Sequence, residues 1–276
     1  MKKISLNDDR RKMNDNTMVL IIIGLLVLMM VIGFFIFRFP EEEDPEESDG
    51  EVVNEEESEE EEEEELTFEE KKKEVVEGFV GEPYESSPLD EERLYTEEGF
   101  DSTTLILSLA AKTNAENDPE EEMKRVNYYP PENVNYENRL HFSSFRNEVS
   151  DYFNPITEGL TEDHIQEKEI VLNKEYEEGE RLIDIDWQKE VTLSYIPSEY
   201  VIDVLNEVPS VAGVMFIMEG DEDIGLDVRS EGIMMDGTDI VYSSSEKGEV
   251  VEMNFVQYLE DSEFDGVTFF EFNEVN

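Results

Sequence analysis

The sequence predicts an α+β domain that is held outside a membrane by a single N-terminal transmembrane helix and a disordered acidic tether. Three observations support this prediction. A long apolar run lies near the N-terminus, an acidic run without basic residues follows it, and short apolar segments with helical or strand periods fill the rest. We expect about two helices packed on a mixed sheet, followed by a β-rich C-terminal extension.

Composition narrows the possible functions before any motif is considered. The chain has 276 residues, with 74 acidic and 21 basic side chains and a net charge of −53. This charge repels phosphate and argues against a nucleic-acid binder. The chain has no Cys, which excludes a disulfide framework, a thiol nucleophile and a zinc–thiolate site. Because it also has only two His, we assign no catalytic, metal-binding or cofactor-binding residue and expect no cofactor.

The apolar run spans residues 18–37 and contains no charged side chain. As a helix it would be about 30 Å long, which matches the hydrocarbon core of a bilayer. A cleaved signal peptide is the alternative, but its apolar region would be about 7–15 residues long. The positive-inside rule places residues 1–17 in the cytoplasm and the chain after the span outside the cell membrane. The basic residues that precede the run are Lys2, Lys3, Arg10, Arg11 and Lys12.

The predicted tether covers residues 38–100. Its residues 41–65 contain 18 acidic and no basic side chains, so they cannot form a core. They could act as a spacer, as a weak calcium binder, or as an unselected solvated run. Residues 66–77 have opposite charges at helical spacing and predict a short helix. Residues 78–100 are rich in Gly and Pro and predict irregular structure.

The acidic excess continues into the part of the chain that must fold. Residues 66–276 carry 53 acidic and 15 basic side chains, a net charge of −38. Self-repulsion on this scale weakens a compact state in dilute buffer, and molar salt screens it. We therefore interpret the charge as an adaptation to a high-salt habitat. An anionic surface that recruits cations or a basic partner is the alternative.

Periodicity predicts the elements of a domain at residues 101–225. We expect a strand at 103–109, a mostly irregular stretch at 113–138 with weak helix potential at 119–125, and a helix at 140–153 that carries an apolar stripe. A turn at 157–161 follows, then a hairpin of two strands, at 168–173 and 181–187. The clearest helix is at 197–208, where Pro197 starts it and Pro209 stops it, and a buried strand at 211–218 comes next.

Residues 226–276 show no helical period and predict a β-rich extension. Its expected strands lie at 239–243, 249–253, 255–259 and 267–272.

Three groups of residues could carry chemistry, and each has a plainer explanation. Asp184 and Asp186 share one face of a predicted strand, but such pairs arise by chance among 74 carboxylates. His141 has no second His or Cys at a metal spacing. The acidic loop 219–223, with Asp227 beyond it, lacks the spacing of a calcium-binding helix–loop–helix. We interpret all three as surface or boundary features.

The order of the segments resembles the GerMN domain, which is named from a sporulation and germination protein. Residues 145–159 are similar to its first helix and the turn after it, and residues 181–190 (RLIDIDWQKE) to its short strand. Residues 199–220 (EYVIDVLNEVPSVAGVMFIMEG) are similar to its closing helix, strand and glycine. The resemblance runs from Ser102 to Gly225. It implies a small α+β fold, a binding or assembly role and no catalytic residues.

The sequence therefore predicts a non-enzymatic, membrane-anchored assembly module of the cell envelope, with a role in sporulation or spore germination. Its expected partners are the membrane, envelope or sporulation-membrane proteins, and further copies of itself, but not nucleic acid. Two alternatives stay open. One is a cell-wall hydrolase that uses paired carboxylates, and the other is an extracytoplasmic ligand-binding domain.

Overall fold

The computed structural model describes residues 66–176 and 179–275. The predicted cytoplasmic residues 1–17, the transmembrane segment 18–37 and the tether residues 38–65 lie outside the described residues. Within the described part of the chain, no helix has the length and apolar character needed to cross a bilayer.

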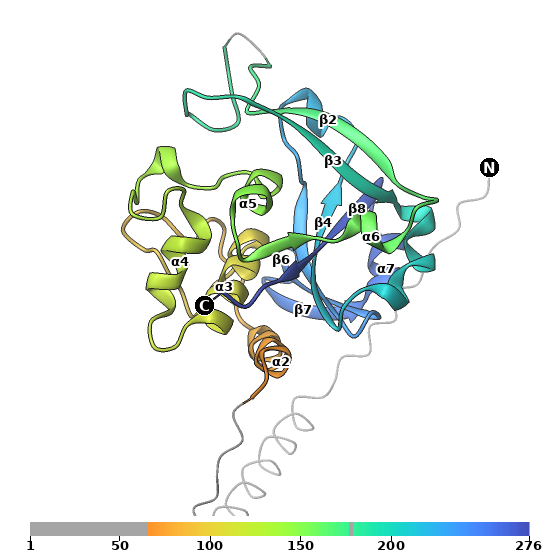
Figure 1. The fold of residues 1–276 in the computed structure, drawn as a ribbon, viewed down its shortest axis with the longest axis horizontal. Coiled ribbons are helices and arrows are strands. Elements are labelled where there is room, and N and C mark those ends of the chain that lie inside the picture. The colour runs from red at the N-terminus through yellow and green to blue at the C-terminus, as the bar shows by residue number, and fades with distance from the viewer. Residues whose placement is uncertain (1–65, 177–178, 276) are drawn as a thin grey trace, which may run out of the picture. The chain divides into compact units, whose positions relative to one another are not determined.

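One antiparallel β-sheet forms the centre of the fold (Figure 1). Seven strands follow the order β2-β3-β8-β4-β5-β6-β7, and the short β1 pairs with β8. Every strand pairing is antiparallel, so the predicted mixed sheet is wrong although the α+β class is confirmed. The strands are β1 (Phe153–Pro155), β2 (Gln166–Leu172), β3 (Lys189–Pro197), β4 (Val211–Ile217), β5 (Ser230–Met235), β6 (Asp239–Ser244), β7 (Glu249–Asn254) and β8 (Gly266–Phe272).

Helices cover both faces of the sheet, with α3 and α4 on one side and α7 on the other (Figure 1). The α-helices are α2 (Phe68–Phe79), α3 (Ser102–Asn114), α4 (Pro119–Asn127), α5 (Ser143–Val149), α6 (Thr157–Leu160) and α7 (Phe255–Glu260). Short 3₁₀ helices are η1 (Tyr136–Asn138), η2 (Ser198–Asp203), η3 (Leu205–Glu207) and η4 (Asp221–Asp223).

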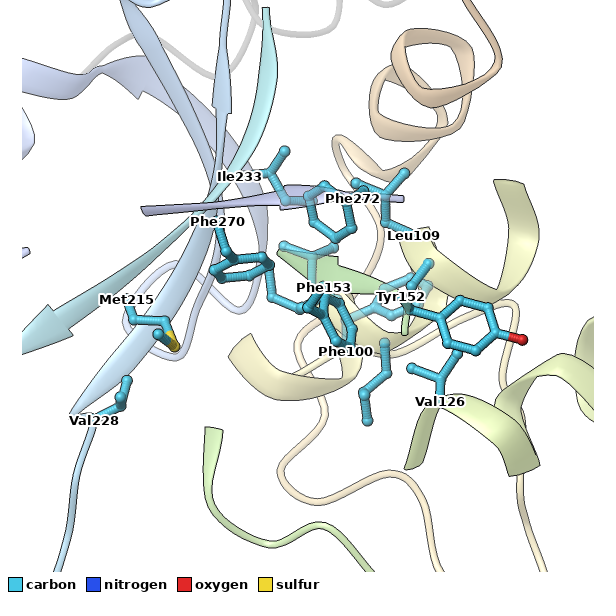
Figure 2. Close-up of a cluster of buried hydrophobic side chains, with 14 of the residues drawn as sticks. Phe100, Leu109, Val126, Tyr152, Phe153, Met215, Val228, Ile233, Phe270 and Phe272 are labelled. Carbon is cyan, nitrogen blue, oxygen red and sulfur yellow. The ribbon is translucent and has the colours of Figure 1, made fainter. Parts of the chain in front are cut away.

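Alternating residues of the central strands supply two separate cores. In β8, Phe270 and Phe272 face the core beneath α3 and α4, whereas Phe269 faces the core beneath α7. Figure 2 shows the first core, where Phe270 and Phe272 lie among side chains from α3, α4 and β1. Gly213 of β4 makes room for the Phe270 ring, because a Cβ there would lie 1.9 Å from that ring.

The strand predicted at 103–109 is wrong, because these residues form the helix α3. The Asp101 carboxylate caps the helix by accepting a hydrogen bond from the Thr104 N–H at 2.8 Å. Eight successive residues of α3, Thr104 to Ala111, are buried. A helix that is apolar on nearly all sides has no amphipathic period, so its sequence looks like a buried strand.

The strand predicted at 181–187 is also wrong, and one side chain explains the difference. The Asn173 amide donates to the carbonyls of Ile185 and Trp187, each at 3.2 Å, and its oxygen accepts from the Ile183 N–H at 3.0 Å. These contacts hold the stretch as a loop and replace the backbone ladder of a hairpin. The partner of β2 is β3, which was not predicted.

Three other predicted elements have the wrong type or length. Residues 197–208 form the 3₁₀ helices η2 and η3 rather than one α-helix, and residues 255–259 form α7 rather than a strand. The Asn254 side chain caps α7 by accepting from the Gln257 N–H at 3.2 Å. The helix predicted at 140–153 is shorter, because it ends at Val149 and β1 follows.

The ends of the described chain are integral parts of the fold. Strand β8 lies between β3 and β4, so residues 226–276 complete the sheet and do not form a separate extension. The short helix predicted at 66–77 is confirmed as α2, and residues 66–100 are part of the folded domain, because α2 buries Val76 and Phe79 in the core and Phe100 packs against Phe79 with ring centroids 4.9 Å apart.

Candidate functional site

A groove of about 490 Å³ lies between α5 and the central strands. Helix α5 supplies Ser144, Asn147 and Glu148 to it, while β4 supplies Met215 and β8 supplies Thr268. A concave site lined by both apolar and polar groups is the usual place for a ligand. We refer to this cavity as the α5 groove.

A buried ion pair lies under α5 and fixes its position. Arg146 is 0% exposed and Glu231 of β5 is 1% exposed. The Arg146 guanidinium contacts the two carboxylate oxygens at 2.6 and 3.3 Å, and it also lies 4.7 Å from the Phe153 ring centroid. A buried charge must be paired in this way, so the ion pair holds the helix in one register against the sheet.

Asn147 presents an amide donor toward the α5 groove. Its oxygen accepts a hydrogen bond from Nε of Arg146 at 3.2 Å, which determines the orientation of the amide. Its nitrogen therefore points the other way, and its partner is Sδ of Met215 at 3.6 Å. Sulfur is a weak acceptor, so this amide can give its hydrogen to a stronger acceptor such as a ligand carbonyl.

Ser144 lines the groove and contacts Asp227, a buried carboxyl group that is not itself one of the lining residues. The Ser144 N–H donates to the Asp227 carboxylate at 2.7 Å, and Asp227 is 3% exposed. Burial raises the pKa of Asp227, the nearby charge of Glu231 raises it further, and the contacts with Ser144 oppose the rise. The Ser144 hydroxyl is buried and forms no hydrogen bond of normal geometry. A carboxyl with a raised pKa beside a free hydroxyl is suited to proton transfer.

Charged and hydroxyl groups line the remainder of the groove. Lys189 of β3 contacts Glu148 at 2.7 Å and lies 4.2 Å from the Phe145 ring centroid. Ser194 donates to Glu158 at 2.7 Å. The groove therefore offers both positive and negative groups at its edge around a less polar floor.

Asp184 and Asp186 do not lie in the α5 groove. Both are exposed on the loop before β3, where they line a different cavity of about 670 Å³ together with Arg181. Asp186 is 3.7 Å from the Arg181 guanidinium. Because the loop is not a strand, the two carboxylates do not form the aligned pair that the sequence suggested.

His141 and the acidic loop also lie elsewhere. Nε2 of His141 is 2.8 Å from the carbonyl oxygen of Tyr136, and burial lowers the pKa of the ring. In the loop, Glu222 contacts Lys168 at 2.6 Å and Asp221 pairs with Arg229. Among the described residues, no group of three or more His, Cys, Asp or Glu side chains could hold a metal ion.

The groups that build the α5 groove were not predicted from the sequence, although one signal was present. Arg146 interrupts an apolar segment that includes Phe142, Phe145 and Val149. A charged residue within an apolar segment predicts a buried partner of opposite sign. That partner, Glu231, lies 85 positions away, and no pattern in the sequence connects the two.

Comparison with solved structures shows which proteins share this fold. A protein of family DUF1460 from Legionella pneumophila is 17% identical, with a TM-score of 0.62, covering 76% of this chain and 91% of that one. An N-acetylmuramoyl-L-alanine amidase from Bacteroides uniformis is 18% identical, with a TM-score of 0.59, covering 74% and 99%. At these identities the likeness concerns the fold alone. No curated protein gives a significant sequence match.

A family model decides the assignment. The AmiA-like model, described as N-acetylmuramoyl-L-alanine amidase-like, matches residues 74–267. This match overturns the GerMN resemblance, and with it the predicted role in sporulation or germination. It also corrects the prediction of a non-enzymatic module, because the family is described by an enzymatic activity. The chain belongs to the AmiA-like family of N-acetylmuramoyl-L-alanine amidase-like proteins.

Proposed function

We propose that residues 74–267 form a cell-wall hydrolase domain that cleaves the amide bond between N-acetylmuramic acid and L-alanine. The observation that carries the proposal is the match of the AmiA-like model to this range. The groove beside α5 supports it, because Ser144, which contacts Asp227, and the amide donor Asn147 both line the groove from that helix. Of the functions considered from the sequence, these observations support the cell-wall hydrolase and not the assembly module.

In this proposal, Asn147 binds the carbonyl oxygen of the scissile amide. Hydrolysis of an amide develops negative charge on that oxygen, and a fixed N–H donor stabilises the charge. The donor is held in place because Arg146 fixes the amide oxygen and Glu231 neutralises Arg146. Asn147 itself is only 5% exposed, so water does not compete strongly for its hydrogen.

The Ser144–Asp227 pair would move the proton. Water adds to the amide carbon and passes its proton through the Ser144 hydroxyl to the Asp227 carboxylate. The carbon–nitrogen bond then breaks, and the proton returns to the leaving nitrogen. The products are the free carboxyl group of the sugar and the free amine of alanine. Burial raises the pKa of Asp227, which makes its carboxylate a stronger proton acceptor than an exposed Asp.

The test is hydrolysis of N-acetylmuramoyl-L-alanine by the purified full-length protein, followed by mass spectrometry of the released alanine. We expect Asp227→Asn to lower kcat about 100-fold or more, as for loss of a general base. Asn147→Asp keeps the acceptor for Arg146 and removes the donor, and we expect a loss of about 100-fold. Asp186→Asn is the control and should retain activity, since its side chain lies outside the groove.

Retained activity in Asp227→Asn would exclude the proposed proton path. Absence of hydrolysis by the wild type in both dilute and molar salt would contradict the hydrolase function itself.

We also propose that residues 18–37 anchor the domain outside the cell membrane, where a cell wall would be accessible. The composition of the span and its flanking charges support this orientation. Protease added to intact protoplasts should digest residues 66–276. Protection of these residues would contradict the orientation.

A further inference from the structure

The side chain of Thr268 lines the α5 groove beside the residue that the Asn147 amide contacts. Thr268 of β8 pairs directly with Met215 of β4, and the Met215 sulfur is the partner of Nδ2 of Asn147 at 3.6 Å. All three residues line the groove. We propose that the Thr268 hydroxyl is a second hydrogen-bond donor, besides Asn147, to the oxygen of the scissile amide. The inference rests on the proposed function and adds a residue that touches the reacting atoms.

The strand pairing places Thr268 on the correct face of the sheet. Thr268 lies two positions before Phe270 in β8, so both side chains point to the same face. Met215 and Phe270 belong to the same core, and Figure 2 shows them on that face. Directly paired residues of antiparallel strands have Cβ atoms about 4.5–5.5 Å apart. The pairing therefore brings the Thr268 side chain close to the sulfur that the Asn147 amide contacts.

The hydroxyl of Thr157 determines where the hydrogen of Thr268 can point. Oγ1 of Thr157 accepts a hydrogen bond from the Phe269 N–H at 2.8 Å. It also lies 2.6 Å from Oγ1 of Thr268 and 3.2 Å from the Phe269 carbonyl oxygen. A hydroxyl has one hydrogen to donate. If Thr157 donates to Thr268, the hydrogen of Thr268 has no partner among the described residues and is available to a ligand in the groove.

In the other arrangement, Thr268 donates to Thr157 and Thr157 donates to the Phe269 carbonyl. The two arrangements differ only by rotation of two hydroxyl groups. The Phe269 carbonyl keeps a hydrogen bond in both, because it also accepts from the Ile156 N–H at 3.0 Å. Donation from Thr268 to a ligand therefore leaves no buried group in this cluster unpaired, and unpaired buried groups are what makes such a change costly.

Burial makes the Thr268 hydroxyl suited to stabilising charge. Thr268 is 3% exposed and Asn147 is 5% exposed, so water competes little for either donor. Hydrogen bonds from fixed donors strengthen as negative charge develops on the amide oxygen. Thr268 keeps its hydrogen throughout the reaction. Its contribution should therefore appear in kcat rather than in KM.

The first test compares two substitutions of Thr268 in the hydrolysis assay with the full-length protein. Thr268→Val removes the hydroxyl and keeps the shape of the side chain, and we expect kcat to fall about 100-fold with little change in KM. Thr268→Ser keeps the hydroxyl and should retain most of the activity. Thr113→Val is the matched control and should have the kcat of the wild type. It removes another buried hydroxyl, which donates to the Leu109 carbonyl at 2.8 Å outside the groove.

The second test needs no turnover. In a phosphinate analogue of N-acetylmuramoyl-L-alanine, a PO₂⁻ group replaces the amide carbonyl and a CH₂ group replaces the nitrogen. The analogue carries the negative charge of the transition state and cannot be cleaved. By isothermal titration calorimetry, we expect Thr268→Val to bind it about 100-fold more weakly than the wild type, and Thr268→Ser to bind it nearly as well.

An unchanged kcat in Thr268→Val would overturn the proposal, as would equal losses in Thr268→Val and Thr268→Ser, which would point to packing. In these cases hydrolysis by the wild type still supports the proposed function. If the wild type does not hydrolyse the substrate, the analogue decides separately. Binding that depends on the Thr268 hydroxyl supports the donor, whereas absent binding, or equal binding in Thr268→Val, contradicts it.

Discussion

Asp227 is a carboxyl group that water hardly reaches, and its burial couples the stability of the fold to pH. The raised pKa means that the folded protein binds this proton more tightly than the unfolded chain does. Below the unfolded value of about 3.9, the group therefore contributes its full stabilisation. That contribution is lost as the pH rises through the raised pKa of the folded state.

Asp227→Asn removes this titration while it keeps an oxygen that can accept from the Ser144 N–H. We expect the free energy of unfolding of the variant, relative to the wild type, to increase as the pH rises above about 3.9. Urea unfolding at a series of pH values measures this difference. A difference that does not change with pH would show that Asp227 titrates normally in the folded protein.

The Arg146–Glu231 pair offers a second test at the level of single residues. Arg146→Met leaves a buried, unpaired carboxylate, and we expect a loss of about 3–5 kcal/mol in the free energy of unfolding. The double variant Arg146→Met with Glu231→Met should recover most of this loss, because it removes both buried charges. Urea unfolding distinguishes the two. An equally unstable double variant would show that packing, and not the lone charge, causes the loss.

At the level of secondary structure, β4 can pack closely against β8 because Gly213 has no side chain and leaves room for the Phe270 ring. Gly213→Ala would place a methyl group 1.9 Å from the Phe270 ring, so the ring or the strands must move. We expect a loss of about 1–3 kcal/mol, as for other overpacked cores. Gly159→Ala is the control, since a Cβ there meets no atom within 4 Å. Equal Tm values for the two variants would contradict the close packing.

The sequence was informative for elements whose side chains alternate or whose ends carry a turn signal. Strands β2, β4, β6, β7 and β8 and helix α2 were predicted at nearly their observed positions. Prediction from the sequence failed where tertiary contacts decide the secondary structure. Helix α3 is buried on almost every side, so its residues carry no helical period. Residues 181–187 alternate like a strand, but the Asn173 side chain takes their backbone hydrogen bonds.

The candidate site was harder to predict than the fold, because its parts are distant in sequence. In the sequence, Asp227 is one acidic residue beyond an acidic loop, and its partner Ser144 lies 83 positions earlier. Burial, which raises the pKa of Asp227, is a property of the folded protein. The chain has 74 acidic residues, and no sequence pattern identifies Asp227 as the buried one that could have a functional role.

At the scale of the whole molecule, the acidic excess should make stability depend strongly on salt. Residues 66–276 carry a net charge of −38. This range has only 15 basic side chains for 53 acidic ones, so most carboxylates have no cation to pair with and their mutual repulsion opposes folding. We expect Tm to rise between 0.1 and about 2 M sodium chloride, over which the Debye length falls from about 10 Å to below about 3 Å. A falling Tm would contradict the interpretation as adaptation to salt.

The central position of β8 has a consequence for how the chain must be made. Strands β3 and β4 do not pair with each other, since β8 lies between them and residues 266–272 come after every other strand. A ribosome adds roughly 5–20 residues per second, so the sheet stays in two parts until translation has nearly finished. The nascent chain therefore cannot close its core early. The strands β4 to β7 can pair with one another beforehand, but β2 and β3 join them only through the last strand to be synthesised.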